Sequence, residues 1–154
     1  MSEVTDWLDP NEMRLWRAFI EVSTRAMGRI EDDLQTDAGL AVDDYEVLVH
    51  LSEAPDRRLR MSELADRTLH SRSRLTHRID RMVGDGLVAR EACPEDRRGV
   101  EAVLTPKGRQ ILDAAAPGHL VSVRAALIDR FTDAEKPFVA DALERVAAEL
   151  RETD

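Results

Sequence analysis

Cysteine, aromatic residues and long apolar runs are scarce in this sequence of 154 residues, and each shortage excludes a class of protein. The single cysteine, Cys93, cannot form a disulfide within the chain, which fits a reducing compartment. No apolar run approaches the roughly 20 residues that a membrane-spanning helix needs. The acidic start, Met1-Ser2-Glu3, is unlike a signal peptide. We therefore expect a cytoplasmic protein without a membrane anchor.

Motifs for catalysis or for metal binding are absent as well. The sequence has no P-loop, no Rossmann glycine pattern, no G-x-S-x-G and no H-E-x-x-H. Its four histidines, His50, His70, His77 and His119, lack metal-ligand spacing and have no cysteine cluster beside them. We expect no enzymatic activity, no cofactor and no bound metal.

Positive charge is short overall but concentrated in one region. The net charge of the chain is −9, yet residues 57–109 hold 13 Lys and Arg against 8 Asp and Glu, a net charge of +5. A basic segment with acidic flanks is consistent with contact to nucleic acid through one part of the chain. The flanks should weaken non-specific DNA binding, because they repel phosphate.

Two short helical patterns begin this basic region, at residues 62–68 and 71–83. In the second pattern Ser71 can cap the helix, and four apolar residues recur at helical spacing: Leu75, Ile79, Met82 and Val83. The opposite side and its flanks are polar and basic. A helix of this kind suits the major groove of DNA. The predicted DNA-contacting residues of this recognition helix are Ser71, Arg72, Ser73, Arg74, Thr76, His77, Arg78 and Arg81.

Different roles are expected within this set. Arg74 and Arg81 could form bidentate bonds to guanine. Arg72 and Arg78 lie nearer the apolar stripe and fit phosphate contacts better. The other interpretation, an ordinary solvated helix face, is disfavoured by the segment that follows.

That segment predicts a β-hairpin. Gly84-Asp85-Gly86 ends the helix, and residues 87–91 and 100–104 have β character. The loop between them carries Asp96, Arg97 and Arg98, which are expected to contact a minor groove or phosphates as the tip of a wing. Alternatively, Asp96 and Arg98 form only a surface ion pair. The fold predicted is mostly α, a winged helix-turn-helix with a two-stranded β-hairpin wing.

Long amphipathic helices are predicted at both ends, at about residues 10–37 and 106–152. Asp43 is expected to cap a second helix, Thr105 the helix that Pro106 begins, and Thr132 the last one. Pro117-Gly118 is expected to kink or interrupt the helix after the wing. The last helix should bury Phe138, Val139, Leu143, Val146 and Leu150. We expect a single domain, 1–154, with a DNA-binding lobe at about 43–105 and end helices that pair with a second subunit.

On these motifs the chain resembles the MarR family of bacterial transcription regulators along nearly its whole length. The residues that carry the resemblance are Asp96-x-Arg98, Leu104-Thr105-x-x-Gly108, Arg90, Gly86-Leu87-Val88 and Ser62-Glu63-Leu64-Ala65. The resemblance implies an obligate homodimer that binds double-stranded DNA at a pseudo-palindromic operator and is often released by a small ligand. It also implies that Arg98 is the signature wing arginine.

The resemblance further implies a ligand crevice beside the DNA-binding lobe. Its candidate residues here are Trp16, Phe19, Tyr45 and His50, which suit a phenolic or aromatic-acid ligand. Each of them could equally be a core residue.

The sequence thus predicts a DNA-binding transcription regulator, a repressor that acts as a homodimer. Two alternatives stay open. Cys93 could act as a redox switch at the base of the wing, or the winged helix could serve protein–protein assembly without an operator of its own.

Overall fold

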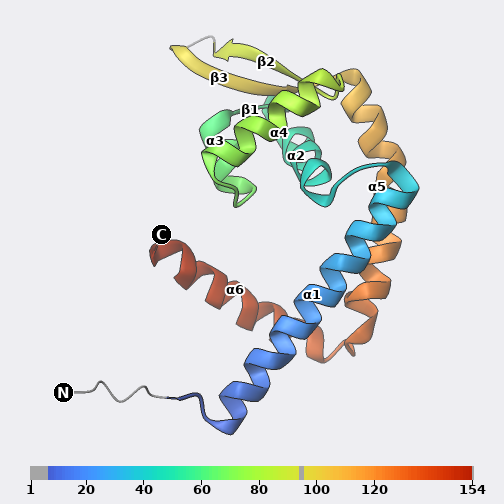
Figure 1. Cartoon of the computed structure of the whole chain (residues 1–154), viewed down its shortest axis with the longest axis vertical. Coiled ribbons are helices and arrows are strands. Elements are labelled where there is room, and N and C mark those ends of the chain that lie inside the picture. Colours follow the sequence, from blue (N-terminus) through green and yellow to red (C-terminus); the bar gives the residue numbers. More distant parts are fainter. Residues whose placement is uncertain (1–6, 94–95, 154) are drawn as a thin grey trace, which may run out of the picture. The chain divides into compact units, whose positions relative to one another are not determined.

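In the computed structural model, residues 7–93 and 96–153 are described, without the side chains of Arg97, Arg98 and Thr153. The mostly α-helical winged helix-turn-helix predicted from the sequence is confirmed (Figure 1). The helices are α1 (Pro10–Ala38), α2 (Val42–Glu53), α3 (Met61–Arg67), α4 (Arg72–Gly84), α5 (Pro106–Ala126) and α6 (Glu135–Thr153). The strands are β1 (Arg58–Arg60), β2 (Val88–Cys93) and β3 (Asp96–Leu104), and two 3-10 turns are Pro55–Arg57 and Ile128–Arg130.

The chain divides into two compact units. The first, which we call the reading lobe, comprises residues 31–120 and contains α2 to α4 and all three strands. The second, the helical unit, comprises the described residues 7–30 and 121–153, with α6 and the outer parts of α1 and α5. The two units are described separately below.

The sheet of the reading lobe has one strand more than the predicted hairpin. Strands β2 and β3 pair antiparallel, with Val88 opposite Leu104, and β1 pairs with the other edge of β3, with Arg58 opposite Val103. The central residue of β1, Leu59, is buried. A strand of three residues is too short to show period-two alternation, so no pattern in the sequence predicts it.

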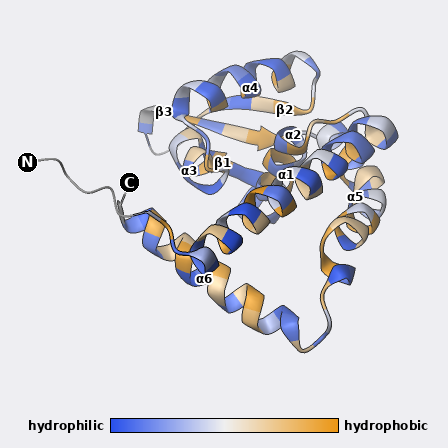
Figure 2. Ribbon diagram, turned by 60° about the horizontal axis from the view of Figure 1, so that its bottom comes forward, coloured by the Kyte–Doolittle hydropathy of each residue, from blue (hydrophilic) through white to orange (hydrophobic). Residues whose placement is uncertain are grey.

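The core of the reading lobe forms around α4. Leu75, Ile79 and Met82 are fully buried against apolar residues of α2, α3 and the sheet. Val83, the fourth residue of the predicted stripe, is 38% exposed, so that part of the prediction is wrong. Polar residues dominate the rest of α4, which is blue over much of its length in Figure 2.

Three of the predicted helix caps are confirmed. The Ser71 hydroxyl accepts the N–H of Arg74 at 3.3 Å, and the Thr105 hydroxyl accepts the N–H of Gly108 at 2.9 Å. Thr132 and Glu135 form a reciprocal capping box, with bonds of 2.9 and 3.3 Å.

Two other local predictions are wrong. Helix α2 begins at Val42, before Asp43, and the Val42 N–H donates to the Glu31 carboxylate at 2.9 Å. A carboxylate distant in sequence therefore satisfies a donor at this helix end. Helix α5 continues through Pro117, so the predicted interruption is wrong, because one proline removes a single backbone bond and the neighbouring turns keep their own. The predicted kink stays a prediction.

The helical unit has almost no core of its own. Among its described residues only Ala26, Ile30 and Ser122 are buried. Large apolar side chains of α6 are 45–76% exposed, namely Phe138, Leu143, Val146 and Leu150. Their predicted burial is therefore wrong for a single chain.

One segment of the described residues, Pro106–Arg130, is long and apolar enough by length and composition to cross a membrane. This differs from the prediction that no apolar run of the chain is long enough to span a membrane. Part of this helix belongs to the core of the reading lobe, where Leu112 and Ala115 are buried. We therefore interpret it as a helix of the fold.

The Leu104-Thr105-x-x-Gly108 pattern has a direct structural reason. The Thr105 hydroxyl lies 2.7 Å from the carbonyl oxygen of Gly86 and 2.9 Å from that of Leu87, and it can donate its one proton to either of them at the start of the wing. A Cβ at Gly108 would lie 2.1 Å from the Leu87 carbonyl oxygen, so no larger residue fits there. The threonine and the glycine together fix the first turn of α5 against the wing.

Gly108→Ala should therefore lower the free energy of unfolding by about 3 kcal/mol, the upper end of the usual range for overpacking. Gly84→Ala is the matched control, since no atom lies within 4 Å of its added Cβ and its backbone is helical. We expect Gly84→Ala to be neutral or slightly stabilising. Urea denaturation of both variants measures the difference, and equal effects would contradict this account of Gly108.

Candidate nucleic-acid interface

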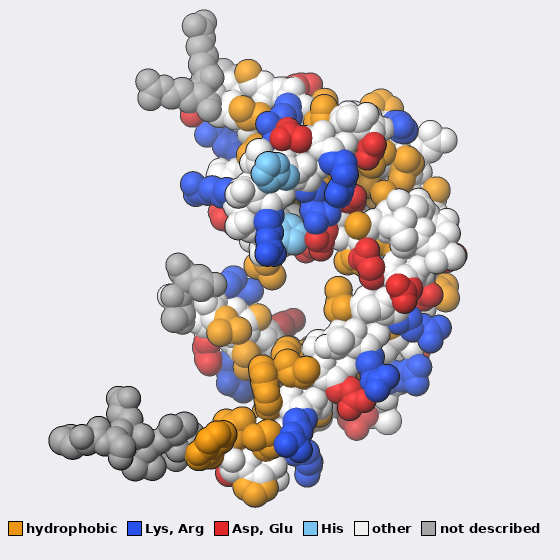
Figure 3. Space-filling model, viewed as in Figure 1, with side chains coloured by type: hydrophobic (Ala, Val, Ile, Leu, Met, Phe, Trp, Pro, Cys, Tyr) orange, Lys and Arg blue, Asp and Glu red, His pale blue; other side chains and the backbone are white. Residues whose placement is uncertain are grey.

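The outer side of α4 presents exposed basic side chains. Arg72, Arg74 and His77 are exposed, and within the described part of the chain their side chains make no hydrogen bond or ion pair. Figure 3 shows arginine and histidine side chains gathered on this face of the reading lobe. Their donors are therefore available to an anionic partner.

The three hydroxyl residues predicted to contact DNA lie on the same helix, and all are exposed. Ser71 serves as the N-cap of α4. Thr76 donates to the carbonyl of Arg72 at 2.8 Å, so its hydroxyl keeps only acceptor capacity for another partner. Ser73 lies between Arg72 and Arg74 in the first turn.

A basic hollow of about 440 Å³ lies beside this face. It is lined by Asp43, His70, Arg74, His77, Arg78 and Arg81. Arg74 and His77 are the lining residues whose side chains have no ion-pair partner among the described residues, so any attraction of the hollow for an anion depends on them.

Arg78 and Arg81 differ from the other arginines of α4, because both are paired with carboxylates of α2. Arg78 donates to Asp44 and to Asp43, each at 2.5 Å. One nitrogen of Arg81 lies 2.6 and 2.8 Å from the two carboxylate oxygens of Asp44. Asp44 is only 8% exposed. Sequence reasoning missed this network, since its partners are 34–37 residues apart.

The same region contains a group of side chains with metal-binding geometry among the described residues. Ligand atoms of Asp43, Glu46 and His70 lie within 4.8 Å of one another. The Asp43 carboxylate is already bonded to the guanidinium of Arg78, and His70 Nε2 lies 3.6 Å from it. The guanidinium of Arg78 therefore already neutralises the Asp43 carboxylate, and we assign no metal here.

The base of the wing is tied to the rest of the lobe by ion pairs. Arg90 of β2 pairs with Asp80 at 3.0 Å and donates to the Thr76 carbonyl at 3.3 Å, which joins the wing to α4. Asp96 lies 3.8 Å from Arg60 of β1, so an arginine of the unpredicted strand is within its reach. The side chains of Arg97 and Arg98 lie outside the described residues, while their backbone belongs to β3.

Cys93 is a poor candidate for a redox switch in this structure. Cys93 is 5% exposed, and the backbone of Gly99 lies so close that a Cβ added to Gly99 would be 3.0 Å from the Cβ of Cys93. Oxidation of a thiol follows thiolate character and accessibility, and this side chain has little access to solvent.

The predicted ligand residues fall in both units. Trp16 and Phe19, 53% and 49% exposed, belong to the helical unit. In the reading lobe the ring of Tyr45 packs against that of His119, with centroids 4.2 Å apart and planes tilted by 41°, and His50 lies 3.7 Å from Glu46. His119 was not among the predicted residues, because nothing in the sequence links it to Tyr45.

Burial perturbs the Tyr45–His119 pair. Desolvation raises the pKa of Tyr45 and lowers the pKa of His119, which favours the neutral form of both rings. Nδ1 of His119 is buried and has no hydrogen-bond partner among the described residues. A neutral aromatic pair with one unused polar atom could bind a small aromatic molecule.

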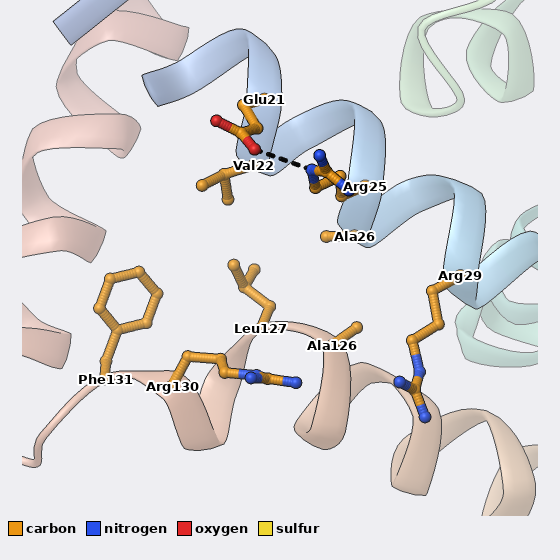
Figure 4. A pocket seen from close by; sticks show the side chains of 9 residues that line it. All are labelled: Glu21, Val22, Arg25, Ala26, Arg29, Ala126, Leu127, Arg130 and Phe131. Carbon is orange, nitrogen blue, oxygen red and sulfur yellow. Dashed lines mark hydrogen bonds and ion pairs between the residues drawn. The ribbon is translucent and has the colours of Figure 1, made fainter. Parts of the chain in front are cut away.

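An open pocket of about 460 Å³ lies within the helical unit (Figure 4). Val22, Ala26 and Leu127 contribute its apolar lining. Three arginines also line it, Arg25, Arg29 and Arg130, of which Arg25 pairs with Glu21 at 2.9 Å. The pocket therefore combines an apolar surface with positive charge.

Two solved structures match this fold closely. AbsC, a MarR family transcriptional regulator from Streptomyces coelicolor, is 43% identical, with a TM-score of 0.92 over 96% of this chain and 99% of its own. Sco3205, a MarR family regulator from the same organism in complex with DNA, is 42% identical, with a TM-score of 0.91 over 94% of each chain.

A curated relative and a family model agree with these structures. The HTH-type transcriptional repressor YetL of Bacillus subtilis (strain 168) is 27% identical over 144 residues, which cover 91% of this chain and 85% of YetL. Residues 38–99, which include α2 to α4 and most of the wing, match the model of the MarR family. With the exposed basic face of α4 and the wing beside it, the chain belongs to the MarR family of winged helix-turn-helix, DNA-binding transcription regulators.

Proposed function

We propose that this chain is a cytoplasmic transcriptional repressor that binds a pseudo-palindromic operator as a homodimer. The observation that carries the proposal is the outer face of α4, where Arg72, Arg74 and His77 are exposed and unpaired among the described residues. The fold is shared with Sco3205, whose structure contains DNA, and the relative YetL is a repressor. The first similarity supports DNA binding, and the second supports repression.

Within this proposal α4 enters the major groove. Arg74 and His77 read base edges, while Arg72 and the exposed hydroxyls of Ser71 and Ser73 contact phosphates or bases. The Thr76 hydroxyl, which keeps only acceptor capacity, accepts from a base amino group. Arg97 and Arg98 of the wing reach the flanking minor groove or backbone, and Asp96 supports the wing from its position near Arg60.

The composition of the helical unit supports a homodimer. With only three buried residues among those described, the helical unit has too small a core to be stable alone. Its exposed apolar side chains would form a core when paired with a second copy. On α1 these exposed side chains are Leu15, Trp16, Phe19, Ile20 and Val22. On α6 they are Phe138, Leu143, Val146 and Leu150.

Charge supports the same pairing. The pocket of the helical unit carries three arginines, and α6 carries the exposed acidic residues Asp141 and Glu144 beside its apolar stripe. A second copy can therefore match both the apolar and the charged parts of this surface. Two-fold symmetry would place two α4 helices about one DNA turn, ~34 Å, apart.

A small phenolic or aromatic acid is the proposed ligand. In the reading lobe, Tyr45 and His119 supply an aromatic wall and an unused hydrogen-bonding nitrogen. Trp16, Phe19 and His50 remain candidate ligand-binding residues. A ligand would release DNA only if it binds one conformation of the dimer better than the other.

Sedimentation velocity tests the dimer. We expect a species of twice the chain mass of 17.3 kDa at micromolar concentration. Leu143→Glu should raise the dissociation constant at least tenfold, because it buries a charge in the interface. Val100→Glu adds the same charge at an exposed apolar position of the wing and should leave the mass unchanged. A wild-type species of 17.3 kDa would contradict the dimer.

Thermal unfolding with hydroxybenzoic acids tests the ligand. A ligand at ten times its Kd should stabilise the native state by about 1.4 kcal/mol and weaken DNA binding. His119→Ala should abolish both effects, while Leu69→Ala, on an exposed turn of the lobe, should keep them. No change in either readout with the wild type would dismiss this ligand class.

Selection of bound DNA from a random duplex pool at physiological salt tests the proposed function itself. We expect enrichment of an inverted repeat whose half-sites are about one helical turn apart, ~10 base pairs. A folded, dimeric protein that enriches no motif would instead favour the assembly-module interpretation.

A further inference from the structure

We propose that Asp44 is a positioning residue for DNA recognition: it holds Arg78 and Arg81 against α2, which sets the orientation of α4 and limits non-specific attraction to DNA. This inference rests on the proposed DNA-binding function. It assigns Arg78 and Arg81 to holding α4 in place and leaves base contacts to Arg74 and His77.

The first support is the rigidity of the anchor. Asp44 belongs to α2, whose residues Val47, Leu48 and Leu51 are fully buried in the core of the reading lobe. Asp44 is itself 8% exposed, so its carboxylate has little freedom to move. A fixed carboxylate can impose its position on a side chain that bonds to it.

The second support is the geometry of the two arginines. Arg78 and Arg81 are three residues apart on α4, so they lie on adjacent parts of one helix side. Both bond to Asp44, at 2.5 Å for Arg78 and 2.6 Å for Arg81. Two bonds from one helix to one carboxylate resist rotation of α4 about its axis. Since Arg74 and His77 are on the same helix, this rotation decides where they meet the bases.

The third support is the balance of charge. Arg78 and Arg81 bring two positive charges, and Asp43 and Asp44 bring two negative charges to the same contacts. This part of α4 therefore adds little net attraction for phosphate. Nε of Arg78 is buried without a hydrogen-bond partner among the described residues, so the guanidinium depends on the two carboxylates. Without Asp44, one cation of the pair would be left to attract DNA.

Asp44→Asn separates this role from a merely structural one. We expect its affinity for a non-specific duplex to rise about threefold or more, and its salt dependence to steepen by about 0.9 in log–log slope for each phosphate newly contacted. The preference for the operator over that duplex should fall about tenfold, because α4 is no longer held in one orientation. Asp113→Asn is the matched control. It also removes one carboxylate from an aspartate–arginine pair, at 2.8 Å from Arg109 on α5, and should leave both affinities unchanged.

A purely structural role for Asp44 would lower both affinities in proportion to the folded fraction. That outcome, or an unchanged ratio of operator to non-specific affinity, overturns the proposal. Non-specific binding needs no operator, so the effect of Asp44→Asn on non-specific affinity can be measured even if the wild type shows no sequence preference. The absence of a sequence preference would contradict the proposed function and would leave this inference to be decided by the non-specific affinities.

Arg81→Met provides a second test that keeps the buried Asp44–Arg78 contact. Because the Asp44–Arg78 contact still holds α4 and Arg81 does not read a base here, operator affinity should stay within threefold of wild type, whereas Arg74→Ala should lower it at least tenfold. If Arg81→Met lowers operator affinity as much as Arg74→Ala does, Arg81 reads DNA directly and the proposal is wrong.

Discussion

The burial of one side of α4 is the constraint on which the rest of this structure depends. Leu75, Ile79 and Met82 are fully buried against α2, α3 and the sheet, so the opposite side must face outward. That side carries the exposed arginines and His77. The same packing holds the wing, because Arg90 joins β2 to Asp80 and to the Thr76 carbonyl. One side of α4 thus forms the core of the reading lobe, and the other is the side that we propose reads DNA.

Charge is distributed so that an acidic protein can bind DNA. The chain has a net charge of −9, while residues 57–109 of the reading lobe hold 13 Lys and Arg against 8 Asp and Glu. Within the lobe not all arginines are available to DNA, since Arg78 and Arg81 are neutralised by Asp43 and Asp44. Arg72 and Arg74 are left exposed. Such an arrangement favours a few well-placed contacts over general attraction to phosphate.

The sequence predicted the features that depend on nearby residues. The caps at Ser71, Thr105 and Thr132 and most of the apolar stripe of α4 are set within a few positions, and the structure confirms them. Features that join distant segments escaped prediction, among them the three-residue strand β1 and the carboxylates that bind Arg78 and Arg81. The exposure of the apolar side chains of α6 was not predicted for another reason. An apolar stripe predicts burial but does not indicate whether the same chain or a second copy covers it.

Guanine N7 methylation interference combined with hydroxyl-radical footprinting, on the operator selected by this protein, tests the central claim most directly. If α4 reads the major groove, methylated guanines should block binding in two segments about one turn apart, ~10 base pairs. Sugar protection by the wing should flank both segments. Protection of the backbone without any interfering guanine, or a single protected segment, would contradict recognition by a pair of α4 helices.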